Sequence, residues 1–204
     1  MRSRGLRRGV LGAAGLVVSA IPVRHDRVAP LEERAFRLIN RLPDAAYPAV
    51  WPPMQFGALA AVPVTAGISY VAGRRVLAAR LIVAGGAAWT AAKVAKQVRV
   101  RGRPARLLHD VRVRGAEASG GGFVSGHAAV ATALAAAAVP RVGGRLGRAL
   151  VILVPVVGAS RLYVGAHLPL DALGGASLGF TVEAATGAFV ARMVTRRRAG
   201  RAVA

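Results

Sequence analysis

The sequence contains no cysteine and is poor in acidic residues, of which there are 8 in 204, and in aromatic residues, which make up 5%. Without cysteine the chain forms no disulfide, uses no thiol nucleophile and builds no zinc site from thiolates. Its 29 Lys and Arg residues give a formal net charge of +21, which would suit a nucleic-acid partner. The scarcity of aromatic side chains for base stacking, and the position of the arginines at the ends of apolar segments, argue against that partner.

Apolar residues dominate what is present. Hydrophobic residues make up 54% of the chain and charged residues 18%, which is unusual for a soluble domain. Apolar segments occur at residues 9–23, 49–72, 76–94, 126–139, 149–164 and 169–193. The second, third and sixth can cross a hydrocarbon core of roughly 30 Å, which needs about 17–25 residues. The others are short and need flanking residues or a locally thinner bilayer. We predict an all-α fold, a polytopic membrane bundle of about six transmembrane helices that forms a single domain over residues 1–204.

The first apolar segment has two interpretations. Arg7 and Arg8 precede a short apolar core, and the stretch Val18-Ser19-Ala20 resembles the small-residue site at which a signal peptide is cleaved. We favour a retained first helix over a cleaved signal.

Clusters of arginine indicate how the helices cross the membrane. In a six-span bundle one side would carry the arginines before segment one, between two and three, between four and five, and in a basic C-terminal tail at residues 192–204. The positive-inside rule makes that side, and both termini, cytoplasmic. Residues 93–114 on the other side are equally basic, so charge alone leaves the orientation open. Either a cytoplasmic anionic-lipid patch or an anionic substrate on the outer face would account for them.

Polar residues next to the apolar segments form three clusters, and ionisable groups in such places are functional candidates. In the first cluster, Lys96 and Arg103 lie at the outer end of segment three. A helix that reaches about residue 102 would place Lys96, Arg99 and Arg103 on one face, and Pro104 would end it. Guanidinium forks and an ammonium group are well suited to phosphate oxygens.

The second cluster is Ser125-Gly126-His127, directly before segment four. Ser125 is a good N-cap, and a helix N-terminus with a glycine lets an anion approach its free N–H groups. His127 would lie in the first turn, beside that anion. A purely structural helix cap is the alternative interpretation.

The third cluster lies between segments five and six, at residues 160–171. Pro169 suits the first position of a helix, so His167 would precede segment six and Asp171 would lie in its first turn. An aspartate four residues after a histidine can hold one imidazole nitrogen and leave the other free as a nucleophile or base. Helix capping by His167 and Asp171 is the alternative.

Together these clusters resemble the signature of the type 2 phosphatidic acid phosphatase (PAP2) superfamily, which reads K-x6-RP, PSGH and SR-x5-H-x3-D. The corresponding stretches are KQVRVRGRP at residues 96–104, VSGH at 124–127 and SRLYVGAHLPLD at 160–171. Every defined position matches except Val124, where the family usually has proline. Proline would stiffen the chain there, so valine is expected to loosen the loop without removing a catalytic group.

The resemblance implies a role for each matching residue. His167 would attack phosphorus to form a phosphohistidine, Asp171 would orient it, and His127 would protonate the leaving oxygen and then activate water. The phosphoryl oxygens would be bound by Lys96, Arg103, Ser125, Gly126 and Arg161. Cations and helix dipoles would take the place of a metal, so neither a metal nor another cofactor is expected. One aspartate and two histidines would also make a poor site for a divalent ion.

The expected function is that of an integral-membrane phosphoric ester or diphosphate hydrolase acting on a lipid. A pocket at the outer interface would accept phosphatidate, phosphatidylglycerol phosphate, a polyprenyl phosphate or diphosphate, or a polyprenyl phosphosugar. We expect a multi-pass plasma-membrane protein with an extracytoplasmic active site. The compact chain and the preference for Arg over Lys indicate a bacterial source.

Two other functions fit the same motifs. A vanadium haloperoxidase has a vanadate pocket built from them, although soluble members are longer and less apolar. A non-catalytic protein that binds or moves anionic lipid would keep the pocket as a binding site, although binding alone would not require a nucleophile with its orienting acid.

Residues outside the motifs carry weaker expectations. Arg99, Arg101 and Arg106 are expected to be solvated rather than to bind headgroups. Glu183 is too far along segment six to join the site, and we expect a basic partner near the cytoplasmic face or a polar helix contact. Small residues along segment six permit close helix packing, within one chain or in a homo-oligomer. They are Gly174, Gly175, Ala176 and Gly179.

Residues 24–47 contain no functional motif but include a candidate amphipathic helix on the outer side, LEERAFRLINRLPD. Its polar face is expected to comprise Glu32, Arg34 and Arg37. The opposite, apolar face is expected to comprise Leu31, Phe36 and Leu38.

Overall fold

The regular structure of this protein is helical. The computed structural model describes residues 2–23, 26–116 and 120–202, and within these ranges it contains helices and no strand. The predicted all-α class is therefore confirmed. Residues 203–204, the end of the predicted basic tail, lie outside the described part of the chain, as do residues 1, 24–25 and 117–119.

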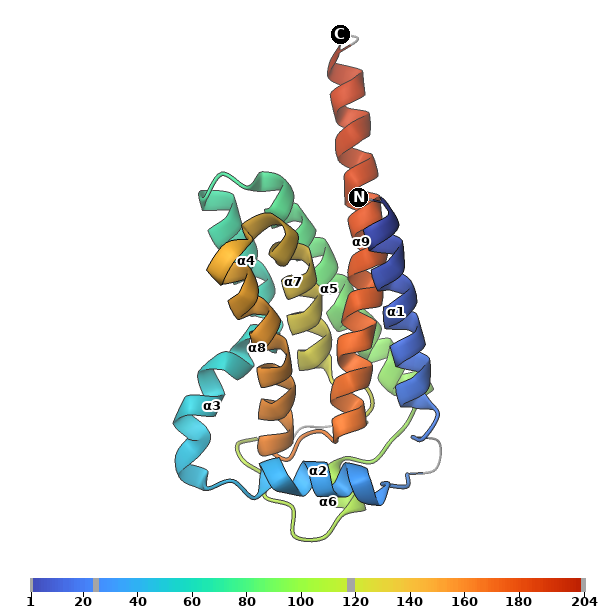
Figure 1. Ribbon diagram of the computed structural model, residues 1–204, viewed down its shortest axis with the longest axis vertical. Helices are drawn as coiled ribbons and strands as arrows, with labels where there is room; N and C mark the ends of the chain where they lie inside the picture. The colour runs from blue at the N-terminus through green and yellow to red at the C-terminus, as the bar shows by residue number, and fades with distance from the viewer. Residues whose placement is uncertain (1, 24–25, 117–119, 203–204) are drawn as a thin grey trace.

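Each predicted apolar segment corresponds to a helix or a pair of helices, and these run alternately in opposite directions along the bundle (Figure 1). The elements of the bundle are α1 (Arg2–Ala20), α3 (Tyr47–Met54) with α4 (Ala61–Val71), α5 (Arg75–Val98), α7 (Gly126–Val142), α8 (Gly144–Tyr163) and α9 (Pro169–Ala202). The shorter elements are α2 (Pro30–Asn40), η1 (Asp44–Ala46), η2 (Gln55–Gly57) and α6 (Pro104–Leu107).

Segment 49–72 is bent rather than straight. The helices before and after residue 58 meet at 72°. Pro52 and Pro53 lie inside α3, where each removes a backbone donor. By length and composition, α5 and α8 are the described helices that can each cross a membrane, and the bent pair makes a third span if it is counted as one. The membrane bundle predicted from the sequence is confirmed, while the number of spans, about six, stays a prediction.

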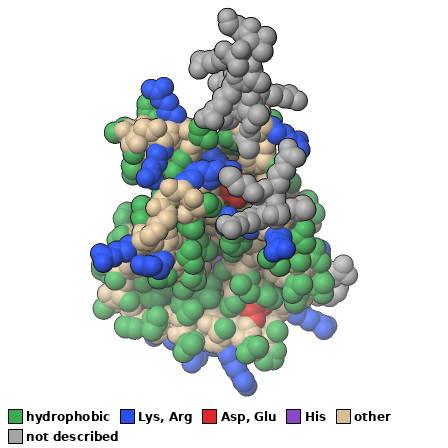
Figure 2. Space-filling view, turned by 45° about the horizontal axis from the view of Figure 1, so that its top comes forward, with side chains coloured by type: hydrophobic (Ala, Val, Ile, Leu, Met, Phe, Trp, Pro, Cys, Tyr) green, Lys and Arg blue, Asp and Glu red, His purple; other side chains and the backbone are tan. Residues whose placement is uncertain are grey.

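The flank of the bundle is covered by hydrophobic side chains, and Lys and Arg gather toward its ends (Figure 2). Ile68 on α4 is 66% exposed and Ile152 on α8 is 63% exposed. Soluble monomers rarely expose apolar surface on this scale. A lipid environment removes the cost of such exposure.

Helix α7 forms the centre of the bundle. Every residue from Ala128 to Ala137 on this helix is buried, and most of them are alanine. Small side chains let α5, α8 and α9 approach closely. A Cβ atom at Gly175 would overlap the carbonyl oxygen of Ser125, and one at Gly179 would overlap that of Ala129. The small residues at these two positions of α9 therefore serve packing within one chain.

Both described ends of the chain lie at one end of the bundle, and α2 and α6 lie across the other (Figure 1). Helix α9 continues past the rest of the bundle, so the predicted tail from residue 192 is helical as far as Ala202. Pro30 at the start of α2 suits a first helical position, and acidic residues occupy its first turn.

The predicted amphipathic helix exists as α2, and Phe36 is buried and Arg34 exposed as expected, but the predicted positions of Glu32, Leu31 and Leu38 are wrong. Glu32, Phe36 and Asn40 point inward, whereas Leu31 and Leu38 are exposed. The buried residues are four positions apart and so share a face. Glu32 and Asn40 are buried because each finds hydrogen-bond partners in the protein.

Candidate active site

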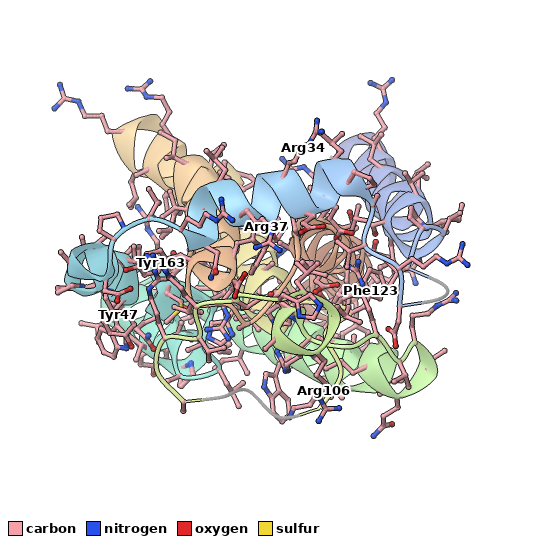
Figure 3. The ribbon with its side chains drawn as sticks, turned by 90° about the horizontal axis from the view of Figure 1, so that it is seen from below. Arg34, Arg37, Tyr47, Arg106, Phe123 and Tyr163 are labelled. Atoms are coloured by element: carbon pink, nitrogen blue, oxygen red, sulfur yellow. The ribbon has the colours of Figure 1, made fainter. Side chains whose placement is uncertain are left out.

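The ends of four helices meet at the end of the bundle opposite the termini. Lys96 is near the end of α5, Ser125 precedes α7, Arg161 lies near the end of α8, and Asp171 is in the first turn of α9. Figure 3 shows this end, with α2 crossing it and the labelled Tyr47 and Tyr163 at one side. The topology thus brings together polar residues that the sequence separates by long apolar helices.

His167 and Asp171 are positioned by the start of α9, which begins at Pro169 as predicted. Both side chains are buried. The backbone N–H of Leu168 donates to Asp171 Oδ2 at 2.8 Å. The same oxygen lies 3.7 Å from His167 Nδ1, beyond hydrogen-bond distance but close enough for electrostatic attraction. In this arrangement Nε2 is the imidazole nitrogen on the side away from the aspartate.

Burial favours the neutral form of His167. Removal of the imidazole from water is the largest influence and lowers the pKa of His167 to about 4, although the negative charge of Asp171 acts in the opposite direction. The positive charges of Lys96 and Arg161 lower the pKa further. The ring is therefore unprotonated at neutral pH and can act as a nucleophile.

The Ser125-Gly126-His127 stretch has the predicted N-cap geometry. Ser125 adopts an extended conformation, and the N–H of Ala128 donates to Ser125 Oγ at 3.4 Å. The backbone N–H of Ser125 donates to the carbonyl oxygen of Asp171 at 2.8 Å, which joins the start of α7 to the start of α9. His127 lies in the first turn of α7, is half-buried, and interacts electrostatically with His167.

Val124, at the position where the family signature has proline, is fully buried and packs in the same hydrophobic cluster as Phe123. The packing of its side chain keeps this part of the loop within the core.

Two of the predicted phosphate-binding cations hold the glycine-rich loop before α7. Lys96 Nζ donates to the carbonyl oxygen of Gly121 at 2.9 Å. Arg103 Nε donates to the carbonyl oxygen of Gly120 at 3.0 Å, and its Nη1 donates to that of Ala166 at 2.7 Å. The charges of Lys96 and Arg103 also interact with each other. Arg103 also lines the cavity described below, and the charge of Lys96 acts on His167.

Helix α5 ends earlier than predicted. It stops at Val98 rather than near residue 102, and Arg99 is extended. Alternating valine and arginine residues follow, a period-2 pattern that suits an extended segment better than a helix. Val98 and Val100 are exposed while Arg101 is buried. Arg103 thus reaches the site from an extended segment and not from a helical face.

The prediction that Arg101 is solvated is wrong. Its side chain is 0% exposed. Nη1 and Nη2 donate to the two carboxylate oxygens of Glu32 at 2.9 and 2.7 Å, and Nη1 also donates to Asp171 Oδ1 at 3.0 Å. Burial by itself would lower the pKa of Arg101, but the hydrogen bonds and charges of these two carboxylates outweigh it and raise the pKa. The arginine is therefore fully charged and paired.

Sequence reasoning missed both Glu32 and Arg101 as members of this site. For Arg101 a signal existed in the alternation of Val98 to Arg103, which places arginines on one side of an extended chain. For Glu32 the spacing to Phe36 and Asn40 defined a face, but its polar members resembled a solvated surface. Arg106 is exposed, as expected, and Arg99 is half-buried.

Arg161 has one buried donor without a partner in the described part of the chain. Its Nη1 contacts the sulfur of Met54 at 3.1 Å, a weak acceptor, and its buried Nε has no hydrogen-bond partner among the described residues. A cavity of about 190 Å³ opens beside it. The side chains that line this cavity include Tyr47, Trp51, Arg103, Arg114 and Arg161. The guanidinium charge of Arg161 would attract a ligand with anionic oxygens in this cavity.

Arg114 lines the same cavity, but the protein itself uses its donors, which bond to Asp44, Asn40 and Leu42. It stacks over the Tyr163 ring at 4.0 Å and pairs with Asp44 at 2.8 Å. Asn40 Nδ2 on α2 donates to the carbonyl oxygens of Arg112, in the loop after α6, and Leu162, near the end of α8. These contacts fasten α2 and the outer loop to the end of α8.

Glu183 lies at the other end of the bundle, as expected. Arg80 Nε donates to Glu183 Oε1 at 2.8 Å, and Nη2 bonds to the same oxygen. Arg80 Nη1 also reaches the carbonyl oxygen of Gly187 at 3.4 Å. The expected basic partner is therefore confirmed, and Glu183 joins α9 to α5 away from the site.

Comparison with known proteins identifies the family. The sequence model of the PAP2 superfamily matches residues 58–197. Among solved structures, LpxE of Aquifex aeolicus has a TM-score of 0.67 and 24% identity, with 78% of this chain and 95% of that chain covered. A transmembrane PAP2-type phosphatidylglycerolphosphate phosphatase from Bacillus subtilis has a TM-score of 0.71 and 19% identity, with 91% and 96% covered.

These two structures share the fold with the chain, and a bacterial source fits both. A comparison with curated protein sequences gives no match. The family match covers most of the chain and includes all three motifs. The chain therefore belongs to the PAP2 superfamily and is a membrane-embedded phosphoric ester hydrolase of the PAP2 type.

Proposed function

We propose that this protein is a metal-independent lipid phosphate phosphatase that works through a phosphohistidine. The observation that carries the proposal is the environment of His167, a buried neutral imidazole with Asp171 on one side and a group of cations nearby. A neutral imidazole is a nucleophile, and cations stabilise the charge that develops on a transferring phosphoryl group.

In the first step His167 Nε2 forms a bond to phosphorus while the bond from phosphorus to the lipid oxygen breaks. The anionic phosphate bound beside His127 favours the protonated form of that imidazole. Protonated His127 then gives the lipid oxygen a proton, and the lipid alcohol leaves. Asp171 stabilises the positive charge on the phosphorylated ring. In the second step His127 takes a proton from water, the resulting hydroxide attacks phosphorus, and inorganic phosphate leaves His167.

The phosphoryl oxygens are bound by cations and backbone amides. Arg161 contributes the guanidinium that lines the cavity, and Lys96 and Arg103 add positive charge nearby. Ser125 and Gly126 begin α7, whose N-terminal N–H groups and dipole favour an anion. These groups supply the charge that a metal would otherwise supply.

A lipid substrate is supported by the position of the site at one end of an apolar bundle. The chain of a lipid phosphate stays in the bilayer while the headgroup enters the cavity. The name of the Bacillus subtilis structure specifies phosphatidylglycerolphosphate, one of the substrates expected from the sequence. We propose that the site faces the outside of the plasma membrane, with both termini in the cytoplasm.

The proposal is tested by phosphate release from detergent-purified protein with EDTA present. The substrates are phosphatidate, phosphatidylglycerol phosphate and a polyprenyl diphosphate, and the variant is His167→Ala. We expect release that survives chelation and is lost in the variant. Loss of release on chelation would contradict the metal-independent mechanism. No release from any lipid, with binding retained, would support a non-catalytic lipid-binding protein instead.

A further inference from the structure

A buried ion-pair network lies behind Asp171. Arg101 is 0% exposed, Glu32 is 7% exposed and Asp171 is 0% exposed. Arg101 occupies one of the unspecified positions in K-x6-RP, and Glu32 lies outside residues 58–197, the part matched by the family model. The family signature therefore assigns no role to either residue.

The geometry divides the donors of Arg101 between two carboxylates. Glu32 accepts from Nη1 and Nη2, so it forms a bidentate pair with the guanidinium. Asp171 receives a single bond from Nη1 to its Oδ1. Its Oδ2 accepts from Leu168 N and faces His167. Each oxygen of Asp171 is thus held by its own donor, which leaves the carboxylate one orientation.

Glu32 also limits how strongly Arg101 can attract Asp171. A guanidinium that faced Asp171 alone would form a two-pronged pair with both carboxylate oxygens, and Oδ2 would turn away from His167. With Glu32 present, two carboxylates share one cation, and the group keeps a net negative charge beside the imidazole. That charge is what a phosphorylated ring requires.

The backbone of α9 takes part in the same network. The N–H of Leu170 donates to Glu32 Oε1 at 3.1 Å. Glu32 therefore binds the first turn of α9 both directly and through Arg101. Helix α2 is joined to the site by this contact at one end and by Asn40 at the other.

We propose that Glu32 and Arg101 are positioning residues that hold Asp171 toward the nucleophile His167 and keep its charge available. This inference rests on the proposed phosphatase function. Both side chains are buried, and their hydrogen bonds lead to Asp171, from Arg101 directly and from Glu32 through Arg101, so both act through Asp171.

The test compares Glu32→Gln with Glu33→Gln in the phosphate-release assay, with activity expressed per folded protein. Glu33 is the neighbouring residue on α2, pairs with Arg37 and is 34% exposed in its side chain, so it is a matched control. We expect Glu32→Gln to lower kcat by roughly 10-fold or more, on the scale of other groups that orient catalytic residues. KM should change by less than about 2-fold, because Glu32 binds no phosphate oxygen. Glu33→Gln should change neither constant.

A double-variant comparison separates positioning from general loss of structure. In an Asp171→Asn background, Glu32→Gln should cause no further loss of the single-turnover rate, because the residue through which it acts is already changed. Arg101→Lys provides a second probe if Glu32→Gln does not fold. It keeps the charge but lacks the fork that Glu32 and Asp171 share, and the same loss of kcat is expected.

Equal kcat for Glu32→Gln and Glu33→Gln in an active parent would overturn this inference alone. The inference would also be overturned if the double variant lost as much single-turnover rate as the product of the losses in Glu32→Gln and in Asp171→Asn. Absence of phosphate release by the parent protein would overturn the proposed function and, with it, this inference.

Discussion

At the residue scale, the charge of His167 is decided by competition between burial and Asp171. Burial removes the water that would stabilise an imidazolium ion, while the aspartate favours it. Burial is the stronger influence, so in the proposed mechanism His167 can attack phosphorus without first losing a proton. Asp171 then acts mainly once a positive charge forms on the ring.

The rate should therefore depend on pH in a way that differs from an exposed histidine. Because the pKa of His167 is lowered to about 4, the neutral form persists as pH falls through 6.5 and is lost only near pH 4. After correction of kcat/KM for the ionisation of the substrate phosphate, we expect protonation of His167 to cause no loss down to about pH 5. Below pH 4 the same protonation should lower kcat/KM about 10-fold per pH unit. An acidic limb centred near 6.5 would contradict a buried neutral nucleophile.

Arg161 should be sensitive to a change of shape at constant charge. Its Nε is unused among the described residues and its Nη1 contacts only a weak acceptor, sulfur. Arg161→Lys keeps the charge but removes the planar fork, so we expect kcat/KM to fall roughly 10-fold, about 1.4 kcal/mol. Arg106→Lys is the control, because Arg106 is exposed. Equal kcat/KM values for the two variants would show that charge alone is sufficient.

At the element scale, the site depends on how closely α9 approaches α7. Gly175 faces the carbonyl oxygen of Ser125, the N-cap of α7, with no room for a Cβ atom. The next turn repeats the arrangement at Gly179. This close contact places the first turn of α9, with Asp171, next to the start of α7.

Gly175→Ala should therefore separate the two helices. We expect a loss of about 1–3 kcal/mol in stability, as for other overpacked sites, seen as a lower Tm in detergent, together with reduced phosphate release. Gly86→Ala is the control, because Gly86 lies inside α5 and a Cβ there meets nothing within 4 Å. Its Tm should stay the same or rise, since alanine favours a helix by about 0.5–1 kcal/mol over glycine. An unchanged Tm for Gly175→Ala would mean that the interface can relax.

Some elements could be predicted from local sequence and others could not. The starts of α7 and α9 were recognisable because a serine cap and a first-turn proline act on their own helix. The end of α5 at Val98 differs from the predicted end because no tight turn signal follows Val98, whereas Pro104 is a strong local stop signal. The inward position of Glu32 on α2 is not predictable from local sequence, because Glu32 is polar and its partners are remote in the sequence.

At the scale of the whole molecule, the alternation of helices places the site and the termini at opposite ends (Figure 1). An extracytoplasmic site with cytoplasmic termini is consistent with this geometry, and a reversed molecule would have the same shape. Orientation therefore requires a measurement in cells.

The absence of cysteine makes that measurement direct, because a single introduced thiol has no background. Arg106→Cys places a thiol at the site end, and Arg145→Cys places one at the exposed turn where α8 begins, at the opposite end. A membrane-impermeant maleimide added to intact cells should label Arg106→Cys at once and Arg145→Cys only after permeabilisation. The reverse pattern would contradict the proposed orientation.

The sequence by itself determined the helical membrane class, the family and the residues of the three motifs. It could do so because hydrophobic length and motif spacing are properties of short stretches. Only the tertiary structure decided that Arg101 is buried, that Glu32 faces inward, and that Arg101 bonds to both Glu32 and Asp171. A charged residue is buried only where packing supplies a partner, and that partner comes from a helix distant in the sequence.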